Sequence, residues 1–140
     1  MRKAAIVVAI CAVTILSGVC DSAKSQASPD TAQLSFTAAQ AQRGGDFYQK
    51  QCAKCHGNSL DNGENGVPLK GEYFQKRWSG KPVSEIFSFM REKMPPEKPG
   101  TLGLPRYADL LAYILSENKI AASASELPSD VSKLESMKMN

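Results

Sequence analysis

The apolar residues of this chain recur at helical spacing in its second half. Between residues 82 and 94 they fall at i, i+3, i+4 and i+7, which is one face of an amphipathic helix. This face consists of Val83, Ile86, Phe87 and Met90. Pro82 suits the first turn of such a helix, and Pro95 and Pro96 end it. The pattern therefore predicts a helix over this segment.

A second apolar face follows closely. It begins near Pro105, ends at about Asn118, and consists of Tyr107, Leu110, Leu111, Ile114 and Leu115. Tyr113 lies at its flank. Because the face is broad and continuous over several turns, it predicts a helix that is largely buried on one side.

A third helix is predicted earlier in the chain, from Thr37 to Cys52. Thr37 and Gln40 have the spacing of a capping box, which marks a helix start. Gly44 and Gly45 lie in its interior, where glycine costs about 0.5 to 1 kcal/mol relative to alanine. We therefore expect another element to approach this helix closely at the glycines.

The N-terminal segment has the pattern of an export signal. Two basic residues are followed by an apolar run over residues 4–19, and small residues stand at Ser25 and Ala27. Cleavage after Ala27 would make residues 1–27 a signal peptide. Two alternatives stay open: an uncleaved membrane anchor, although the run is short for a bilayer span, and lipidation at Cys20 in a box that resembles a lipoprotein signal.

The length of 140 residues suits one small domain. We predict a linker over residues 28–35, an all-α domain over residues 36–120, and a flexible tail over residues 121–140, where Ser and Ala are frequent. The formal net charge of +3 indicates no nucleic-acid partner. Basic residues between positions 70 and 98 are mixed with glutamates, which fits either a solvated surface or a docking surface for an acidic redox partner.

The chemistry of the chain centres on Cys52-Ala53-Lys54-Cys55-His56, which contains its only histidine. A Cys-x-x-Cys-His run is typical of a c-type haem attachment site. Cys52 and Cys55 would each form a thioether to the porphyrin, and His56 would ligate the iron. A thioredoxin-like redox pair or half of a zinc site also uses Cys-x-x-Cys, but the chain has no βαβ pattern and no second cysteine pair outside the predicted signal. The motif predicts one covalent haem c.

Residues 36–119 resemble the single-haem class I cytochromes c. Gly44 and Tyr48 precede Cys52 by eight and four positions, as the helix-crossing glycine and aromatic of that family do, and residues 109–113 resemble its last helix. The resemblance implies a small all-α fold in which the N- and C-terminal helices cross near a covalently bound haem. It also implies an electron carrier and no enzyme.

A sixth iron ligand is expected from methionine, because a Met/His pair raises the potential of the couple. Met90 fits the apolar helix face, whereas Met94 precedes Pro95 and is biased toward extended geometry. A Met-Pro pair is also how the sixth ligand of the family usually appears. We expect Met94 to be the second axial ligand beside His56.

The same resemblance implies further haem contacts. Residues 65–71 resemble the family loop in which a proline carbonyl accepts the second ring hydrogen of the axial histidine, which gives this role to Pro68 and places Leu69 against the haem face. An ordinary surface turn is the alternative for both residues. Trp78, the only tryptophan, either donates its indole N–H to a haem propionate or simply fills the core near the haem.

The order of these motifs looks like that of cytochromes that accompany bacterial quinoprotein dehydrogenases. The resemblance implies such a dehydrogenase as electron donor and a terminal oxidase or another cytochrome as acceptor. We expect a periplasmic protein that cycles one haem between Fe(III) and Fe(II), with membrane attachment facing the periplasm only if the N-terminus is retained or lipidated. The alternatives are a haem enzyme or gas sensor with an open sixth position, and a haem subunit permanently docked in a dehydrogenase complex.

Overall fold

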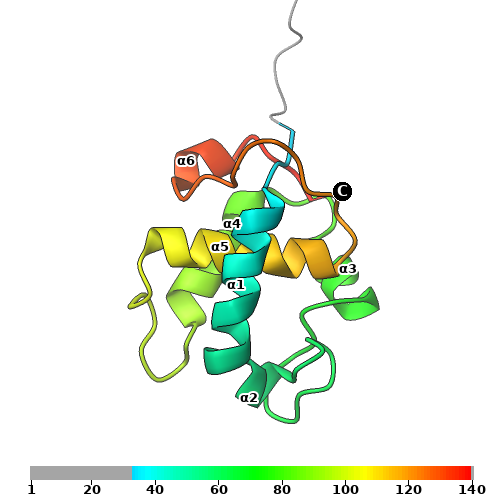
Figure 1. Cartoon of the computed structure of the whole chain (residues 1–140), viewed down its shortest axis with the longest axis vertical. Helices are drawn as coiled ribbons and strands as arrows, with labels where there is room; N and C mark the ends of the chain where they lie inside the picture. The colour runs from blue at the N-terminus through cyan, green and yellow to red at the C-terminus, as the bar shows by residue number, and fades with distance from the viewer. Residues whose placement is uncertain (1–32, 140) are drawn as a thin grey trace, which may run out of the picture.

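The structure, a computed structural model, describes residues 33–139 (Figure 1). Within this range the chain is helical, and its one β-type pairing is an isolated antiparallel bridge between Pro82 and Lys138. The described helices are α1 (Ala38–Gln51), α2 (Ala53–His56), α3 (Glu72–Trp78), α4 (Val83–Lys93), α5 (Leu104–Glu117) and α6 (Val131–Leu134). The all-α prediction is confirmed. The predicted signal peptide, residues 1–27, lies outside the described residues.

Helices α1 and α5 cross in close contact, as the interior glycines predicted (Figure 1). A Cβ atom at Gly44 would overlap the carbonyl oxygen of Asp109 and lie 2.9 Å from Cβ of Tyr113. The ring of Tyr113 packs against Tyr48, with 5.3 Å between the ring centroids. The crossing therefore needs a residue without a side chain at position 44.

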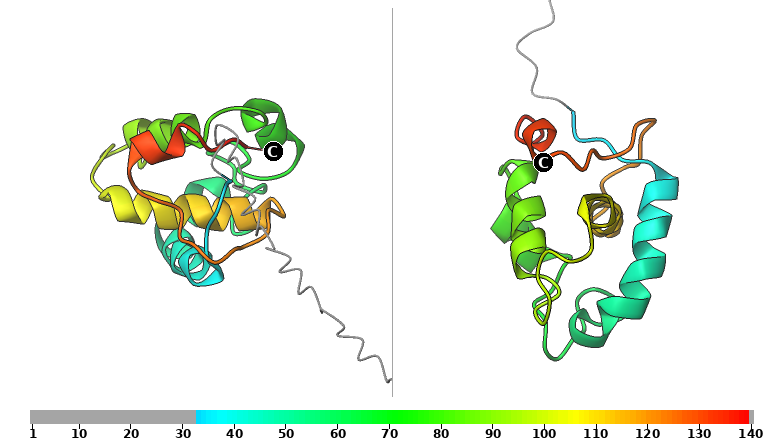
Figure 2. Two further views of the ribbon diagram at one scale, coloured as in Figure 1. Left: turned by 90° about the horizontal axis from the view of Figure 1, so that it is seen from above. Right: turned by 90° about the vertical axis from the view of Figure 1, so that its left-hand side faces the viewer.

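The core lies between α5 and its two long neighbours. Figure 2 shows α5 end-on, with α1 on one side and α4 on the other. The predicted apolar face of α5 is buried along its whole length, and the ring of Tyr107 meets that of Phe87 from α4 edge-on, with 6.4 Å between centroids. Burial of this face supplies most of the driving force that holds the helices together.

The predicted capping box at the start of α1 is only half formed. Thr37 accepts a hydrogen bond from the backbone N–H of Gln40 through its hydroxyl, at 3.1 Å, as predicted. The side chain of Gln40 does not return to Thr37. It is 2% exposed, and its amide forms two hydrogen bonds with the backbone of Leu127, at 3.0 Å and 2.7 Å.

The prediction of a flexible tail after residue 120 is wrong for the residues that the structure describes. Residues 121–139, here called the C-terminal strap, fold back over the domain (Figure 1). Leu127, Leu134 and Met139 are at most 2% exposed. These apolar residues are isolated among polar ones, so they have no periodicity that a sequence pattern could reveal, yet each fills a place in the core.

Backbone hydrogen bonds fix the two ends of the strap. At its start, the N–H of Ser123 donates to the carbonyl of Phe36 at 2.7 Å. At its end, Met139 pairs with the turn before α4: it accepts from the N–H of Gly80 at 2.6 Å and donates to the carbonyl of Lys81 at 3.0 Å. The strap thus joins the beginning of α1 to the beginning of α4.

Candidate haem site

The Cys-x-x-Cys-His motif forms the corner between α1 and α2. Cys52 caps the end of α1, and its carbonyl accepts from the N–H groups of both Cys55 and His56, at 3.1 Å and 3.0 Å. Both thiols are free and partly exposed. Burial, together with the neighbouring Cys55 thiol, raises the pKa of the Cys52 thiol to about 11. The single helical turn therefore brings two available sulfur atoms and one imidazole to the same corner.

The imidazole of His56 is held by one of its two nitrogens. The side chain is 9% exposed, and Nδ1 lies 2.9 Å from the carbonyl oxygen of Val67. Because a carbonyl only accepts, Nδ1 carries the hydrogen, and in the neutral imidazole Nε2 then has the free lone pair. No residue described in the structure forms a hydrogen bond with Nε2, so this nitrogen is the one available to ligate a metal.

The carbonyl that accepts the hydrogen bond from His56 belongs to Val67. The prediction that gave this role to the carbonyl of Pro68 is therefore wrong by one position. The oxygen of Val67 is part of the peptide bond that the proline ring completes. Proline also restricts Val67 to extended backbone geometry, which sets the direction of that carbonyl. Pro68 therefore acts on the histidine through the peptide bond before it.

Two glycines shape the same loop, and the sequence analysis did not assign them a role. A Cβ atom at Gly66 would lie 2.5 Å from Nδ1 of His56, and one at Gly63 would lie 2.6 Å from its Cα atom. Any side chain there would displace the histidine or the loop. The frequency of glycine between residues 57 and 71 was the available signal, but only the three-dimensional contacts show which glycines lie against the ring.

Leu69 and Trp78 lie at two different places around the core. Leu69 is partly buried against the core, and its N–H donates to the carbonyl of Leu60 at 2.6 Å. Trp78 ends α3, is 7% exposed, and meets the ring of Phe89 edge-on at 5.7 Å between centroids. The guanidinium of Arg77 lies 5.0 Å from the indole ring. Trp78 thus has the packing expected of a core residue and a cationic neighbour.

Met94 stands where the sequence predicted, directly after the last turn of α4. It is the C-cap residue, with extended backbone angles, and its side chain is half-buried. Tyr107 tethers it, because the phenol donates to the carbonyl of Met94 at 2.6 Å. Met90 lies within α4 and packs against the core. The two candidate methionines therefore differ as predicted: one belongs to the helix and the other to the segment that leaves it.

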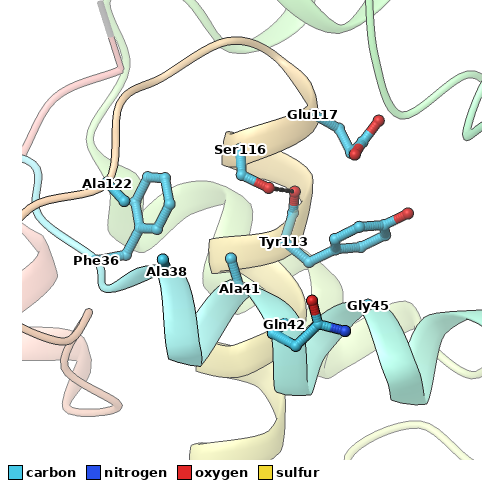
Figure 3. Close-up of a pocket in the computed structure, with 9 residues that line it drawn as sticks. All are labelled: Phe36, Ala38, Ala41, Gln42, Gly45, Tyr113, Ser116, Glu117 and Ala122. Atoms are coloured by element: carbon cyan, nitrogen blue, oxygen red, sulfur yellow. Dashed lines mark hydrogen bonds between the residues drawn. The ribbon is translucent and has the colours of Figure 1, made fainter.

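The groove beside the helix crossing is separate from these residues. It has a volume of about 310 Å³ and lies between α1 and the second half of α5 (Figure 3). Gly45 and Tyr113 line it, together with Phe36 at one end. Neither the motif cysteines nor the candidate iron ligands belong to its lining.

The donor set of the motif corner fits a covalently bound haem. It provides two free thiols three positions apart and one imidazole whose Nε2 is available, next to glycines that allow a close approach. Among residues 33–139, no group of three or more His, Cys, Asp or Glu side chains is placed to hold a bare metal ion. The helical fold and this corner define a class I c-type cytochrome domain.

Comparison with known proteins agrees with this class. Residues 39–114 match the family model described as cytochrome c oxidase, cbb3-type, subunit III. The match covers more than half of the chain, so the protein belongs to this family of cytochrome c domains. No curated protein and no solved structure matched the chain.

Family membership establishes the cofactor and the general activity. Domains of this family bind haem c covalently and serve in haem-based electron transfer with redox protein partners; they are generally carriers and not enzymes. Cytochrome c domains of this type are usually extracytoplasmic. Among residues 33–139, no helix is long and apolar enough to cross a membrane.

Proposed function

We propose that this protein is an exported electron carrier with one haem c, bound through Cys52 and Cys55 and ligated by His56 and Met94. The observation that carries the proposal is the hydrogen bond between Nδ1 of His56 and the carbonyl of Val67, because it orients the imidazole and leaves Nε2 for the iron. When bound, the haem supplies reversible one-electron chemistry between Fe(III) and Fe(II).

The protein residues have distinct tasks in this proposal. Each cysteine thiol would add across a vinyl group, so that one S–C bond would form and the thiol hydrogen would go to the neighbouring vinyl carbon. His56 would ligate the iron through the lone pair of Nε2. Met94 would supply its thioether sulfur as the second protein ligand, which would favour the ferrous state. Tyr107 supports that ligand by holding the carbonyl of Met94 at the end of α4.

The methionine assignment is tested by a matched pair of variants. Met94→Ala should lose the weak sulfur-to-iron band at the red end of the ferric spectrum, lower the reduction potential and give a high-spin or water-ligated haem. Met90→Ala should keep the spectrum and lose stability by about 2 to 5 kcal/mol at most, since it removes a partly buried core side chain. The opposite pattern would assign the ligand to Met90.

The same spectra decide between a carrier and a haem enzyme or gas sensor. A carrier with two protein ligands should resist carbon monoxide in the ferrous state. Wild-type protein that binds carbon monoxide readily would have an open sixth position, and the proposal of a simple carrier would then be wrong.

We further propose that residues 1–27 direct export and are removed, that residues 28–35 form a linker, and that the mature protein acts in the periplasm. The mass of protein recovered from the periplasmic fraction measures the cleavage site. A mass equal to that of a chain beginning at Ser28 with one attached haem agrees with this proposal. Recovery of the full-length or lipid-modified chain from membranes would show instead that the protein is anchored and faces the periplasm.

The proposed electron donor is a quinoprotein dehydrogenase, and the proposed acceptor is a terminal oxidase or another cytochrome. A second arrangement is favoured by the family description, which names a subunit of a cbb3-type oxidase: the domain would be permanently docked in a larger complex. Gel filtration of the native protein separates the two. A diffusible carrier elutes at the size of the single domain, whereas a docked subunit elutes with its complex.

A further inference from the structure

Asn118 joins the end of α5 to the loop that holds the axial histidine. Its Nδ2 group donates to the carbonyl of Leu69 at 3.0 Å, and its Oδ1 atom accepts from the N–H of Gly71 at 3.1 Å. Nδ2 also donates to the carbonyl of Ile114 within α5, at 2.8 Å. One side chain therefore forms hydrogen bonds on both sides of the interface between helix and loop.

The orientation of this amide is fixed by its partners. Nδ2 faces two carbonyl oxygens and Oδ1 faces an N–H group, so a flipped amide would lose all three hydrogen bonds. Lys70 adds a weaker link, since its Nζ lies 3.9 Å from Glu117 on α5 and 3.8 Å from Asp61. Residues 69–71 are thus attached to the end of the helix at three successive positions.

The attached segment continues directly into the histidine contact. Leu69 is two residues after Val67, whose carbonyl accepts from Nδ1 of His56 at 2.9 Å. Pro68, between them, has little backbone freedom because its ring fixes one dihedral angle. Because Pro68 can absorb little of the movement, a displacement of Leu69 also displaces the carbonyl of Val67.

We propose that Asn118 is a positioning residue for electron transfer: it fixes the loop so that the carbonyl of Val67 stays in hydrogen-bond range of His56. Such a hydrogen bond makes the axial imidazole more basic, and a more basic ligand stabilises Fe(III) and lowers the reduction potential. The proposal rests on the proposed role of His56 as an axial ligand.

The test is Asn118→Ala in the haem-loaded, full-length protein, measured in two ways. The Nδ1 proton of His56 in the ferrous protein should exchange with solvent at least about tenfold faster, because the loop opens more often. The reduction potential should rise: a shift of about threefold in the ferric–ferrous equilibrium corresponds to ~28 mV at 59 mV per tenfold for one electron.

Gln40→Ala is the matched control, because Gln40 is also an amide whose two hydrogen bonds hold a distant segment, the strap at Leu127. This variant should lose stability and leave the potential and the relative protection of the histidine proton unchanged. If both variants change the two readouts equally, Asn118 has only a structural role and the proposal is wrong. An unchanged potential and exchange rate in Asn118→Ala also overturn it.

A second variant covers the case in which Asn118→Ala does not yield folded protein. Asn118→Asp keeps the acceptor for the N–H of Gly71 and loses the donor to Leu69, so the Nδ1 proton of His56 should again exchange faster than in the wild type. Its added negative charge itself lowers the potential, so exchange is the readout for this variant. Failure of the proposed function has a different signature: wild-type protein would then show no ring proton of a haem-ligated His56. An intact wild-type signal that the Asn118 variants leave unchanged contradicts only the positioning role.

Discussion

A methyl group added at the crossing of α1 and α5 should destabilise the protein at Gly44 and leave its stability nearly unchanged at Gly45. At Gly44 the new Cβ atom would lie 2.6 Å from the carbonyl carbon of Asp109, whereas ordinary contact begins at 3.4 Å. The carbonyl oxygen of Asp109 lies closer still, and because both atoms belong to backbone, the two helices would have to move apart. At Gly45 the new atom would lie 3.1 Å from the ring of Tyr113. That ring borders the open groove in Figure 3 and can turn away.

The expected magnitudes follow from these contacts. Overpacking of a core costs about 1 to 3 kcal/mol. Replacement of a glycine inside a helix by alanine adds about 0.5 to 1 kcal/mol to the free energy of unfolding when no clash results. Because a clash with backbone belongs at the upper end, Gly44→Ala should lose about 2 kcal/mol of unfolding free energy, which lowers the melting temperature by roughly 8 to 16 °C in a domain of this size. Gly45→Ala should change stability by no more than ~0.5 kcal/mol.

Urea unfolding of the two haem-loaded variants, followed by far-ultraviolet circular dichroism, measures this difference. The slope of free energy against denaturant should be the same for both, so that the midpoints report stability directly. Gly45→Ala serves as the internal control, since it adds the same atom one residue away on the same helix. Equal midpoints, or a lower midpoint for Gly45→Ala, would refute the account of the crossing.

Two further predictions concern single hydrogen bonds. Tyr48→Phe should lose about 1 kcal/mol of stability in urea unfolding, because the phenol donates a hydrogen bond to the carbonyl of Gly57 at 2.7 Å. Tyr73→Phe removes the hydroxyl of an exposed tyrosine and should leave stability unchanged. Equal losses in the two variants would contradict this prediction. The hydrogen bonds from the hydroxyl and the backbone N–H of Ser132 lower the pKa of Asp130. The contribution of Asp130 to α6 is therefore present above the ordinary pKa of about 3.9 and is lost as the pH falls through the lowered pKa. Amide protection in α6 should therefore fall in acid in the wild type, and a matching fall in Asp130→Asn would show that another group is responsible.

The helices that carry the site could be predicted because their signals are local and repeated. The apolar face of α5 and that of α4 extend over several turns, and the prolines after Met94 mark where the helix must end. The motif at Cys52–His56 is equally local. The glycine at position 44 predicted a close approach because its cost within a helix needs a compensating contact, and the structure supplies that contact at Asp109.

The elements that escaped prediction depend on partners distant in sequence. Gln40 has the spacing of a capping box, yet its amide is used 87 residues away at Leu127, where a buried backbone group needs a hydrogen bond. The strap is held by isolated apolar residues and backbone pairing, which leave no periodic signal. The acceptor for His56 is a backbone carbonyl, and neighbouring residues of a loop offer nearly identical carbonyls, so sequence alone could not choose Val67 over Pro68.

The optical spectrum of the exported, purified protein in both oxidation states is the most direct test of the central claim, that His56 and Met94 ligate one covalent haem in an electron carrier. We expect a weak sulfur-to-iron band at the red end of the ferric spectrum, sharp α and β bands after reduction, and colour that stays with the protein in acid-acetone extraction. A ferric spectrum without that band, a ferrous form that readily binds carbon monoxide, or haem that extracts into the solvent would contradict it.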